Sequence, residues 1–393
     1  MGGGDLGSYG GGAMRGAPTP NLDRLAAEGM RFVNYYGQAS CTAGRASFIT
    51  GRVPIRTSLS AVLAPGDPNG LTKQTPTIAQ YLKQAGYNSV QLGKWHVGDK
   101  LENFPTSNGF HEMYDMLRYY AGVYRLCRQG AASELPLPRQ IVHGDLGSGR
   151  PVAMERAGRR SADGGEEGVH LCRPRHRRRH HAANAIDWLK AHAKDENMYL
   201  CFLKVHNPNN PSPRWKDKSP GGGTYLDALM ELDDNSGQVV QAIRDLGIDK
   251  DTLVIWTTDN GAWIDAWPDA GYTPFRGMKG SSFEGGFRVP AIAWWPGHIK
   301  PGTVNMDMWS HMDWWPTFGK LAGLEPPPHD WKDNDGKPII STASTSASRC
   351  SPLAPARAKA SSISTTRASA GCASRTSRRS IPPRTPGSDR TSR

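Results

Sequence analysis

The sequence lacks any run of 18 or more apolar residues, and none of its six cysteines belongs to a Cys-x-x-Cys pair. The first absence predicts that no segment spans a membrane. The second argues against a zinc cluster or a dense disulfide framework. The opening residues, MGGGDLGSYGGG, also lack the apolar stretch of a signal peptide. The cellular compartment therefore stays unknown from these features.

Positive charge is confined to two segments of the chain. The overall net charge of +12 would suit nucleic-acid binding. Residues 126–182 carry 11 arginines against 6 acidic residues, and residues 341–393 carry nine arginines and one lysine against one aspartate, which leaves a net charge of −2 for the rest. Neither segment interleaves aromatic residues with its basic ones, so we expect no nucleic-acid partner.

The same two segments differ from the rest in pattern. Residues 341–393 are rich in Ser, Arg, Ala, Thr and Pro without apolar periodicity, which predicts a low-complexity basic tail without ordered structure. Residues 126–182 form an anomalous insert of similar character. Two interpretations stay open. In the first, both segments are out-of-frame translations of a GC-rich gene, and resequencing the DNA across both junctions tests this. In the second, both are basic disordered inserts. One folded domain is predicted over residues 1–340.

The remaining chain alternates helical and strand patterns. Residues 75–96, 182–206 and 225–261 each read as an amphipathic helix, a turn and an apolar strand. RVPAIAWWPG, residues 288–297, reads as one more strand. Helices that alternate with apolar strands predict an α/β fold, in which a mainly parallel sheet is sandwiched by helices.

Polar residues follow three of the predicted strands. Lys94 and His96 end the first, His206 ends the second, and Asp259 and Asn260 end the third. Because sites in open α/β sheets form beyond the carboxyl ends of strands, we expect these residues to converge on one pocket. Taken singly, a histidine there is more often structural, and Asp-Asn-Gly is usually a turn. Their joint occurrence favours a site.

The stretch CTAGRASFITGR, residues 41–52, reads as a short helix after the strand RFVNYY. Cys41 then lies at or just before a helix N-terminus, where backbone N–H groups and the helix dipole favour anions. Arg45 is four residues further on, so its side chain lies on the same face. The pair suits an oxyanion substrate. The alternative is a buried, inert cysteine beside a solvated arginine.

This stretch resembles the signature of the type I sulfatases, Cys-x-Pro/Ala-x-Arg followed by Thr-Gly-Arg. These are arylsulfatase-like, formylglycine-dependent enzymes of the alkaline phosphatase superfamily. Other blocks resemble the family in order: GDLGSYGGGAMRGAPTPNLDRLAAEGMRFVNYY, GKWHVGD, TTDNGAW, FRGMKGSSFEGGFRVPAIAWWPG and SHMDWWPTFGKLAGL. The resemblance covers residues 4–125 and about 183–340. It implies a sulfatase-like catalytic domain over 1–340.

The resemblance implies hydrolysis of a sulfate monoester, either an aryl sulfate or a sulfated carbohydrate. It also implies a maturation enzyme that converts Cys41 to formylglycine, and a divalent cation, Ca²⁺ or Mg²⁺. The implied catalytic roles fall on six residues: Cys41 as the formylglycine precursor, Arg45 holding it, Lys94 and Lys279 binding sulfate, His96 assisting elimination, and His206 protonating the leaving group with Lys279. The implied metal ligands are Cys41, Asp259 and Asn260.

One part of the family pattern is missing. Family members begin with an apolar strand that ends in an Asp-Asp pair of metal ligands, whereas this chain starts at MGGGDLGSYG. We therefore expect an N-terminally truncated sulfatase whose first, central strand is absent. The implied ligands are few for a cation that takes about six to eight oxygens. Two alternatives to a sulfatase stay open: a phosphate or phosphonate ester hydrolase of the same superfamily, and an inactive anion-binding remnant.

Overall fold

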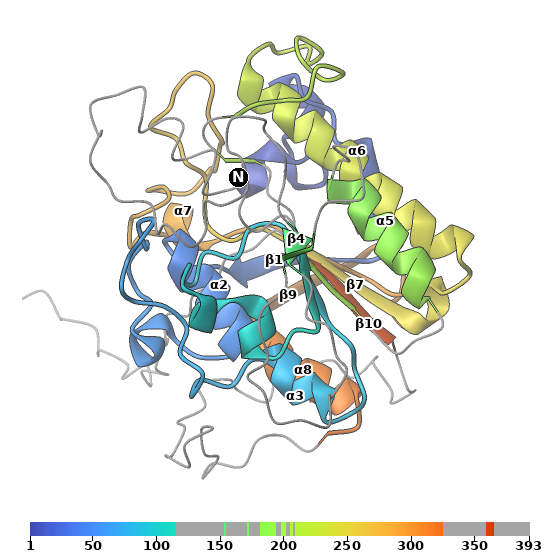
Figure 1. Cartoon of the computed structure of the whole chain (residues 1–393). Helices are drawn as coiled ribbons and strands as arrows, with labels where there is room; N and C mark the ends of the chain where they lie inside the picture. The colour runs from blue at the N-terminus through green and yellow to red at the C-terminus, as the bar shows by residue number, and fades with distance from the viewer. Residues whose placement is uncertain are drawn as a thin grey trace, which may run out of the picture.

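A computed structural model describes residues 1–114, 153–154, 171–172, 181–193, 198–201, 205–206, 209–324 and 359–364. Its centre is a six-stranded sheet (Figure 1). Five of its strands run in one direction, and β8 runs against both of its neighbours. This confirms the predicted α/β fold with a mainly parallel sheet. In spatial order the strands are β6 (Met198–Cys201), β10 (Lys359–Ser364), β7 (Thr252–Thr257), β8 (Ala291–Trp294), β1 (Met30–Tyr36) and β9 (Thr303–Ser310).

A smaller sheet extends the architecture beside β6, where β2 comes close to that strand. Its strands are β2 (Val90–Leu92), β3 (Glu112–Tyr114), β4 (Ala153–Met154) and β5 (Leu171–Cys172). The α-helices are α1 (Pro20–Glu28), α2 (Cys41–Thr50), α3 (Ile78–Lys83), α5 (His181–His192), α6 (Thr224–Asp245), α7 (Glu284–Phe287) and α8 (Trp314–Leu321). The 3₁₀-helices are η1 (Gly3–Asp5), η2 (Gly7–Tyr9), η3 (Gly12–Arg15), η4 (Pro54–Thr57), η5 (Leu101–Asn103), η6 (Pro105–Asn108), η7 (Asp249–Asp251) and η8 (His311–Asp313). No helix in the described ranges has the length and apolar character needed to cross a membrane.

Helices cover both faces of the larger sheet. Helices α5 and α6 lie side by side on one face with α1, and α2, α3 and α8 pack on the other (Figure 1). Strand β7 is buried along its whole length. Its Leu253 and Ile255 join the core with α2, α3 and α8, whereas Val254 and Trp256 join the core with α1, α5 and α6. Because successive side chains of a strand point to opposite faces, a central strand buried on both sides needs this continuous apolar run.

Local sequence explains how the first predicted helix–strand unit forms. Thr77 caps α3 in a capping box, since its Oγ1 accepts from the Gln80 N–H at 3.2 Å and Gln80 Oε1 accepts from the Thr77 N–H at 3.0 Å. The following strand is shorter than predicted. It ends at Leu92 because Gly93 leaves the extended conformation with φ +91°. Lys94 therefore lies in a loop beyond the strand.

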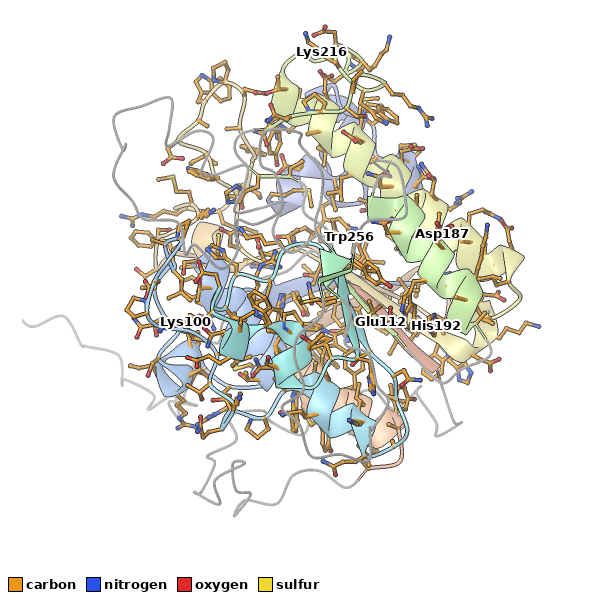
Figure 2. The ribbon with its side chains drawn as sticks, viewed as in Figure 1. Lys100, Glu112, Asp187, His192, Lys216 and Trp256 are labelled. Atoms are coloured by element: carbon orange, nitrogen blue, oxygen red, sulfur yellow. The ribbon has the colours of Figure 1, made fainter. Side chains whose placement is uncertain are left out.

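A polar contact joins the smaller sheet to the helical layer. Figure 2 shows Glu112 of β3 next to His192 at the end of α5, and His192 Nε2 lies 3.6 Å from the Glu112 carboxylate. Both side chains are partly exposed, so this pair contributes at most about 1 kcal/mol. The alignment of α5 therefore depends on its apolar face, where Trp188 and Leu189 are buried.

The tail differs in part from its prediction. Within residues 341–393, Lys359–Ser364 form β10, which pairs in parallel with β6 and with β7. The prediction of a tail without ordered structure is therefore wrong for these six residues. Backbone hydrogen bonds to two neighbouring strands form without an apolar side-chain pattern, so the composition of the segment did not reveal the strand. Strand β7 consequently has partners on both sides. Residues 126–152, 155–170 and 173–180 of the anomalous insert lie outside the described residues.

Gly51 ends α2 and is the first residue of the Gly-Arg that closes the 41–52 stretch. It has φ +64°, and a Cβ built on it would lie 2.9 Å from Trp315 Cβ. We expect Gly51→Ala to lower the free energy of unfolding by about 2–4 kcal/mol, from left-handed backbone strain plus overpacking. Gly297 has φ +83° with open space around it, so Gly297→Ala should cost only about 1–2 kcal/mol. Urea unfolding of both variants checks this, and equal losses would contradict the packing argument.

Candidate active site

The predicted site residues converge at the carboxyl ends of the strands. Cys41 begins α2, which follows β1, and Lys94 follows β2. His206 follows β6, and Asp259 follows β7. Lys279 comes from a long loop, which is fixed where the Lys279 N–H donates to the Ala262 carbonyl at 2.8 Å. The structure thus brings together side chains that follow different strands, as expected from their places in the sequence.

Cys41 lies at the centre of this group. It is the first residue of α2, and its side chain is buried. Lys94 Nζ lies 3.3 Å from the Cys41 Sγ atom, and His206 Nε2 lies 3.9 Å from it. The helix N-terminus and the Lys94 ammonium both favour negative charge at this point. The prediction that position 41 faces an anion site is consistent with this geometry.

His206 connects Cys41 to Lys279. Lys279 Nζ lies 3.3 Å from His206 Nε2. Because an ammonium group only donates hydrogen bonds, His206 Nε2 is the acceptor and the ring carries its proton on Nδ1. Burial, together with the charges of Lys94 and Lys279, lowers the pKa of His206 to about 4. The imidazole is therefore neutral at pH 7.

Arg45 holds the framework of the site. Its guanidinium is buried, donates to the Lys94 carbonyl, and donates to Asp259 Oδ2 at 3.2 Å. The other carboxylate oxygen of Asp259 accepts from the Asn260 amide at 2.8 Å. One side chain of α2 thus fixes the loop after β2 relative to the loop after β7.

His96 is buried in an unusual backbone conformation. Its φ is +62°, although it is not glycine, and its carbonyl accepts from Thr42 Oγ1 at 3.0 Å. Its Nε2 lies 3.0 Å from the Leu63 carbonyl. Burial, with a further contribution from the Lys94 charge, lowers the pKa of His96 to about 4. Strain of this kind persists where the surroundings enforce it, as they do in functional sites.

The sequence did not identify a buried chain of polar groups behind Asp259. Trp314 Nε1 donates to Tyr35 Oη at 2.9 Å, and Tyr35 Oη lies 2.8 Å from His311 Nδ1. His311 is buried, which lowers its pKa to about 4 although a hydrogen bond to the Asp259 carboxylate opposes the shift. His311 stands in the block SHMDWW, but nothing in its spacing connects it to Asp259, 52 positions earlier.

The described residues do not fit a complete calcium site. Asp259 and Asn260 carry oxygens of the hard type that calcium and magnesium prefer. Both oxygens of Asp259 already accept from Arg45 and Asn260. No group of three or more His, Cys, Asp and Glu side chains placed to hold a metal occurs in the described ranges. Calcium takes about six to eight oxygens, so Asp259 and Asn260 do not complete its coordination.

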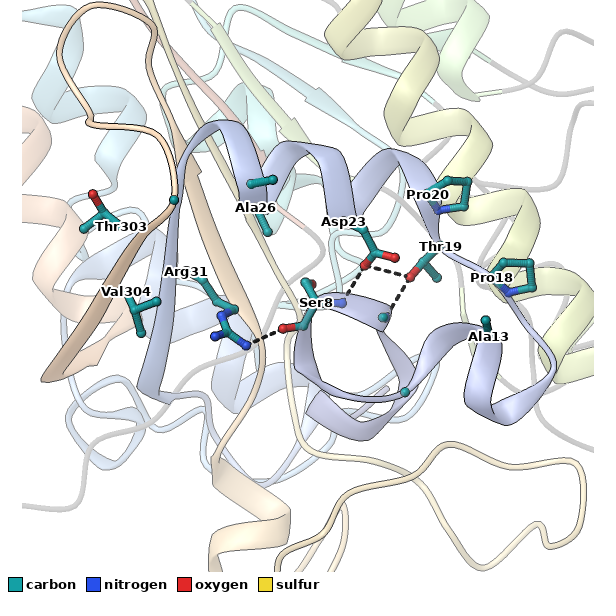
Figure 3. A pocket seen from close by; sticks show the side chains of 14 residues that line it. Ser8, Ala13, Pro18, Thr19, Pro20, Asp23, Ala26, Arg31, Thr303 and Val304 are labelled. Carbon is teal, nitrogen blue, oxygen red and sulfur yellow. Dashed lines mark hydrogen bonds between the residues drawn. The ribbon is translucent and has the colours of Figure 1, made fainter.

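A hollow lies away from this site, at the N-terminus of α1 and the start of β9 (Figure 3). It encloses about 570 Å³. Asp23 Oδ1 accepts from the Ser8 N–H at 2.6 Å and from Thr19 Oγ1 at 3.2 Å, and Arg31 donates to the Ser8 carbonyl. These polar groups bind one another across the wall of the hollow. None of the predicted site residues lines it.

Comparison with known proteins agrees with this geometry. The Sulfatase family profile matches residues 1–324. N-acetylgalactosamine-6-sulfatase of Sus scrofa is 34% identical over 83% of this chain and 61% of its own length. Arylsulfatase A of Homo sapiens is 35% identical over 83% of this chain and 63% of its own length. The crystal structure of the PsFucS1 sulfatase from Pseudoalteromonas sp. superposes with a TM-score of 0.67 and 30% identity, covering 86% of this chain and 71% of that chain.

The fold and the site define a protein of the alkaline phosphatase-like class. Within that class the chain belongs to the sulfatase family. Sulfatases hydrolyse sulfuric esters and generally use a divalent cation and a formylglycine. The chain spans about three fifths of the length of the curated relatives that it matches.

Proposed function

We propose that this protein hydrolyses a sulfate monoester at position 41. The observation that supports this best is the position of Cys41 at the start of α2, with Lys94 Nζ 3.3 Å and His206 Nε2 3.9 Å from its Sγ. Oxidation of Cys41 by a maturation enzyme gives formylglycine, whose hydrate supplies the oxygen nucleophile and later releases sulfate as the aldehyde re-forms. Arg45 holds this residue in place from the next turn of the same helix.

Cationic side chains bind the substrate in this proposal. Lys94, which lies beside the nucleophile, and Lys279, which lies beside His206, take the sulfate oxygens as compact point charges. The N-terminal N–H groups of α2 add a third source of positive potential. This arrangement also neutralises charge as the anionic group is attacked, because preorganised donors stabilise a transition state without reorganising.

Proton transfer falls to the two histidines and Lys279. As the sulfur–oxygen bond to the alcohol breaks, the leaving oxygen takes a proton from the Lys279–His206 pair. His206 accepts at Nε2, so the Lys279 ammonium supplies the proton for the leaving oxygen. His96, neutral for the reason given above, accepts the proton of the remaining hydroxyl when sulfate leaves. Each group is thus in the protonation state that its role needs.

The substrate class and the cation belong to the same proposal. The names of the relatives above point to aryl sulfates or sulfated carbohydrates. Asp259 and Asn260, with the oxygen of formylglycine 41, are the proposed ligands for Ca²⁺ or, alternatively, Mg²⁺. Because they are so few, we expect weak cation binding, which calorimetric titration of the matured full chain with calcium chloride measures. Tight, stoichiometric uptake would contradict that expectation.

The proposal is tested on the full chain produced with and without a formylglycine-generating enzyme. The tryptic peptide of residues 32–45 should lose about 18 Da on maturation, since a thiol becomes an aldehyde. Only the matured protein should hydrolyse 4-nitrophenyl sulfate, and Cys41→Ala should lower its kcat by at least about 10³-fold.

The same assay separates the alternatives. Faster turnover of 4-nitrophenyl phosphate or a phenylphosphonate ester than of the sulfate would favour the related phosphoryl hydrolase. Matured protein that binds inorganic sulfate but turns over no ester would be an anion-binding remnant. Either result would overturn the proposed sulfatase activity.

A further inference from the structure

Trp263 contacts both members of the proposed proton-donating pair. The Lys279 ammonium lies over the Trp263 ring, 4.2 Å from its centroid. The His206 ring meets the same indole edge-on, with 5.5 Å between centroids. Trp263 is half-buried and follows Asp259 by four positions, where nothing in the sequence pattern predicts a role for it.

We propose that Trp263 is a positioning residue that holds the Lys279 ammonium against His206, so that the pair delivers a proton to the leaving oxygen. This inference rests on the proposed function, because it concerns the departure of the alcohol in that reaction. The ring face attracts a cation through its quadrupole, most strongly where water is partly excluded. The half-buried indole meets that condition.

Lys279 needs such a support for two reasons. Its side chain has four rotatable carbons, so an unsupported ammonium would sample many positions. Lys94 also lies close to Cys41, and its charge affects His206 together with that of Lys279. The ammonium groups of Lys94 and Lys279 repel each other, and this repulsion favours movement of Lys279, the more exposed of the two, toward solvent. Trp263 opposes that movement.

The backbone supports the same arrangement. The Lys279 N–H donates to the carbonyl of Ala262, the residue directly before Trp263, at 2.8 Å. The main chain therefore fixes where the lysine side chain starts, and the indole fixes where it ends. Trp263 and Lys279, which are 16 positions apart in the sequence, are therefore held together at the site.

The kinetic test compares leaving groups on matured full-length protein. 4-Nitrophenolate leaves without a proton, whereas phenolate, about as basic as a tyrosine side chain with a pKa of about 10, requires one. Trp263→Leu keeps apolar bulk but removes the ring. It should lower kcat on phenyl sulfate by roughly 10-fold or more and on 4-nitrophenyl sulfate by less than about 3-fold. Trp263→Phe should recover most of the loss.

Trp267 offers a matched control in the same loop. It is 79% exposed, so Trp267→Leu should change neither rate by more than about 2-fold. A loss at Trp263→Leu that is equal for both esters would overturn the positioning role, since proton delivery affects only the poor leaving group. A similar loss at Trp267→Leu would attribute the effect to the loop as a whole.

A second measurement does not need turnover. Reductive ¹³C-methylation labels the lysines of the full-length Cys41 protein, and Lys279→Arg identifies the Lys279 signal. Its methyl resonances should be shifted upfield by the indole ring, and Trp263→Leu should return them to the position of solvated lysines. An unshifted Lys279 signal in the wild type overturns the inference even if no ester is hydrolysed. A shifted signal in a protein without sulfatase activity would instead refute the proposed function alone.

Discussion

Replacing Arg45 with alanine is expected to lower the free energy of unfolding by about 3–5 kcal/mol and to abolish turnover. The guanidinium is 3% exposed and joins the Lys94 carbonyl to Asp259 Oδ2. Its removal leaves Asp259, a largely buried carboxylate, with one fewer charged partner. It also frees the loop that carries Lys94. Urea unfolding and turnover of 4-nitrophenyl sulfate measure the two effects.

The control for this prediction is an exposed arginine. Arg214 is 72% exposed and lies 3.9 Å from Asp234, so Arg214→Ala should cost less than about 1 kcal/mol. A double variant, Arg45→Ala with Asp259→Asn, should recover part of the lost stability, because it removes the uncompensated charge. Additive losses in the double variant would show that the loss at Arg45→Ala does not come from Asp259, which leaves the hydrogen bond to the Lys94 carbonyl and packing as its sources. In that case its contact with Asp259 would contribute no coupling.

The strand ends were predictable because they follow from a backbone rule. Apolar runs of strand length identify β6 and β7, and parallel strands bring their carboxyl ends to one edge whatever their order in the sheet. His206 and Asp259 could therefore be placed together from the sequence. Cys41 could be placed at a helix start from the change of pattern at residue 41. Lys279 required the family resemblance, since it comes from a loop without periodicity.

Contacts between distant loops could not be predicted in the same way. Trp263 reaches Lys279 within one loop, and Tyr35 of β1 reaches His311 of η8, only because the tertiary fold brings them together. No local pattern encodes such a pair. The short strand β10 was missed for a related reason. Its sequence KASSIS is not apolar, and its place between β6 and β7 depends on available backbone partners rather than on its own side chains.

Lowering the pH from 7 to 4.5 should reduce the stability of the wild type relative to the His96→Gln variant by roughly 2–3 kcal/mol. The pKa of His96 is about 4 in the folded protein, below the usual 6.5, because the ring is buried and lies near the Lys94 charge. Between these two pH values the unfolded chain binds the additional proton. Protonation therefore favours unfolding. The free energy of unfolding is highest above pH 6.5, where His96 is neutral in both states, and it falls as the pH is lowered toward 4. Glutamine has no such equilibrium, and its amide still reaches the Leu63 carbonyl.

Urea unfolding of both proteins at a series of pH values measures this difference, and other titrating groups cancel because both proteins share them. His111 gives the matched comparison. Burial, with the Lys83 charge, lowers its pKa as well, but its ring is only partly buried. His111→Gln should therefore change the pH dependence in the same direction by a smaller amount. Parallel curves for wild type and His96→Gln would mean that His96 titrates normally in the folded protein. A His96 with the ordinary pKa of 6.5 is still mostly neutral at pH 7, so that result would refute the lowered pKa and leave its role as the base intact.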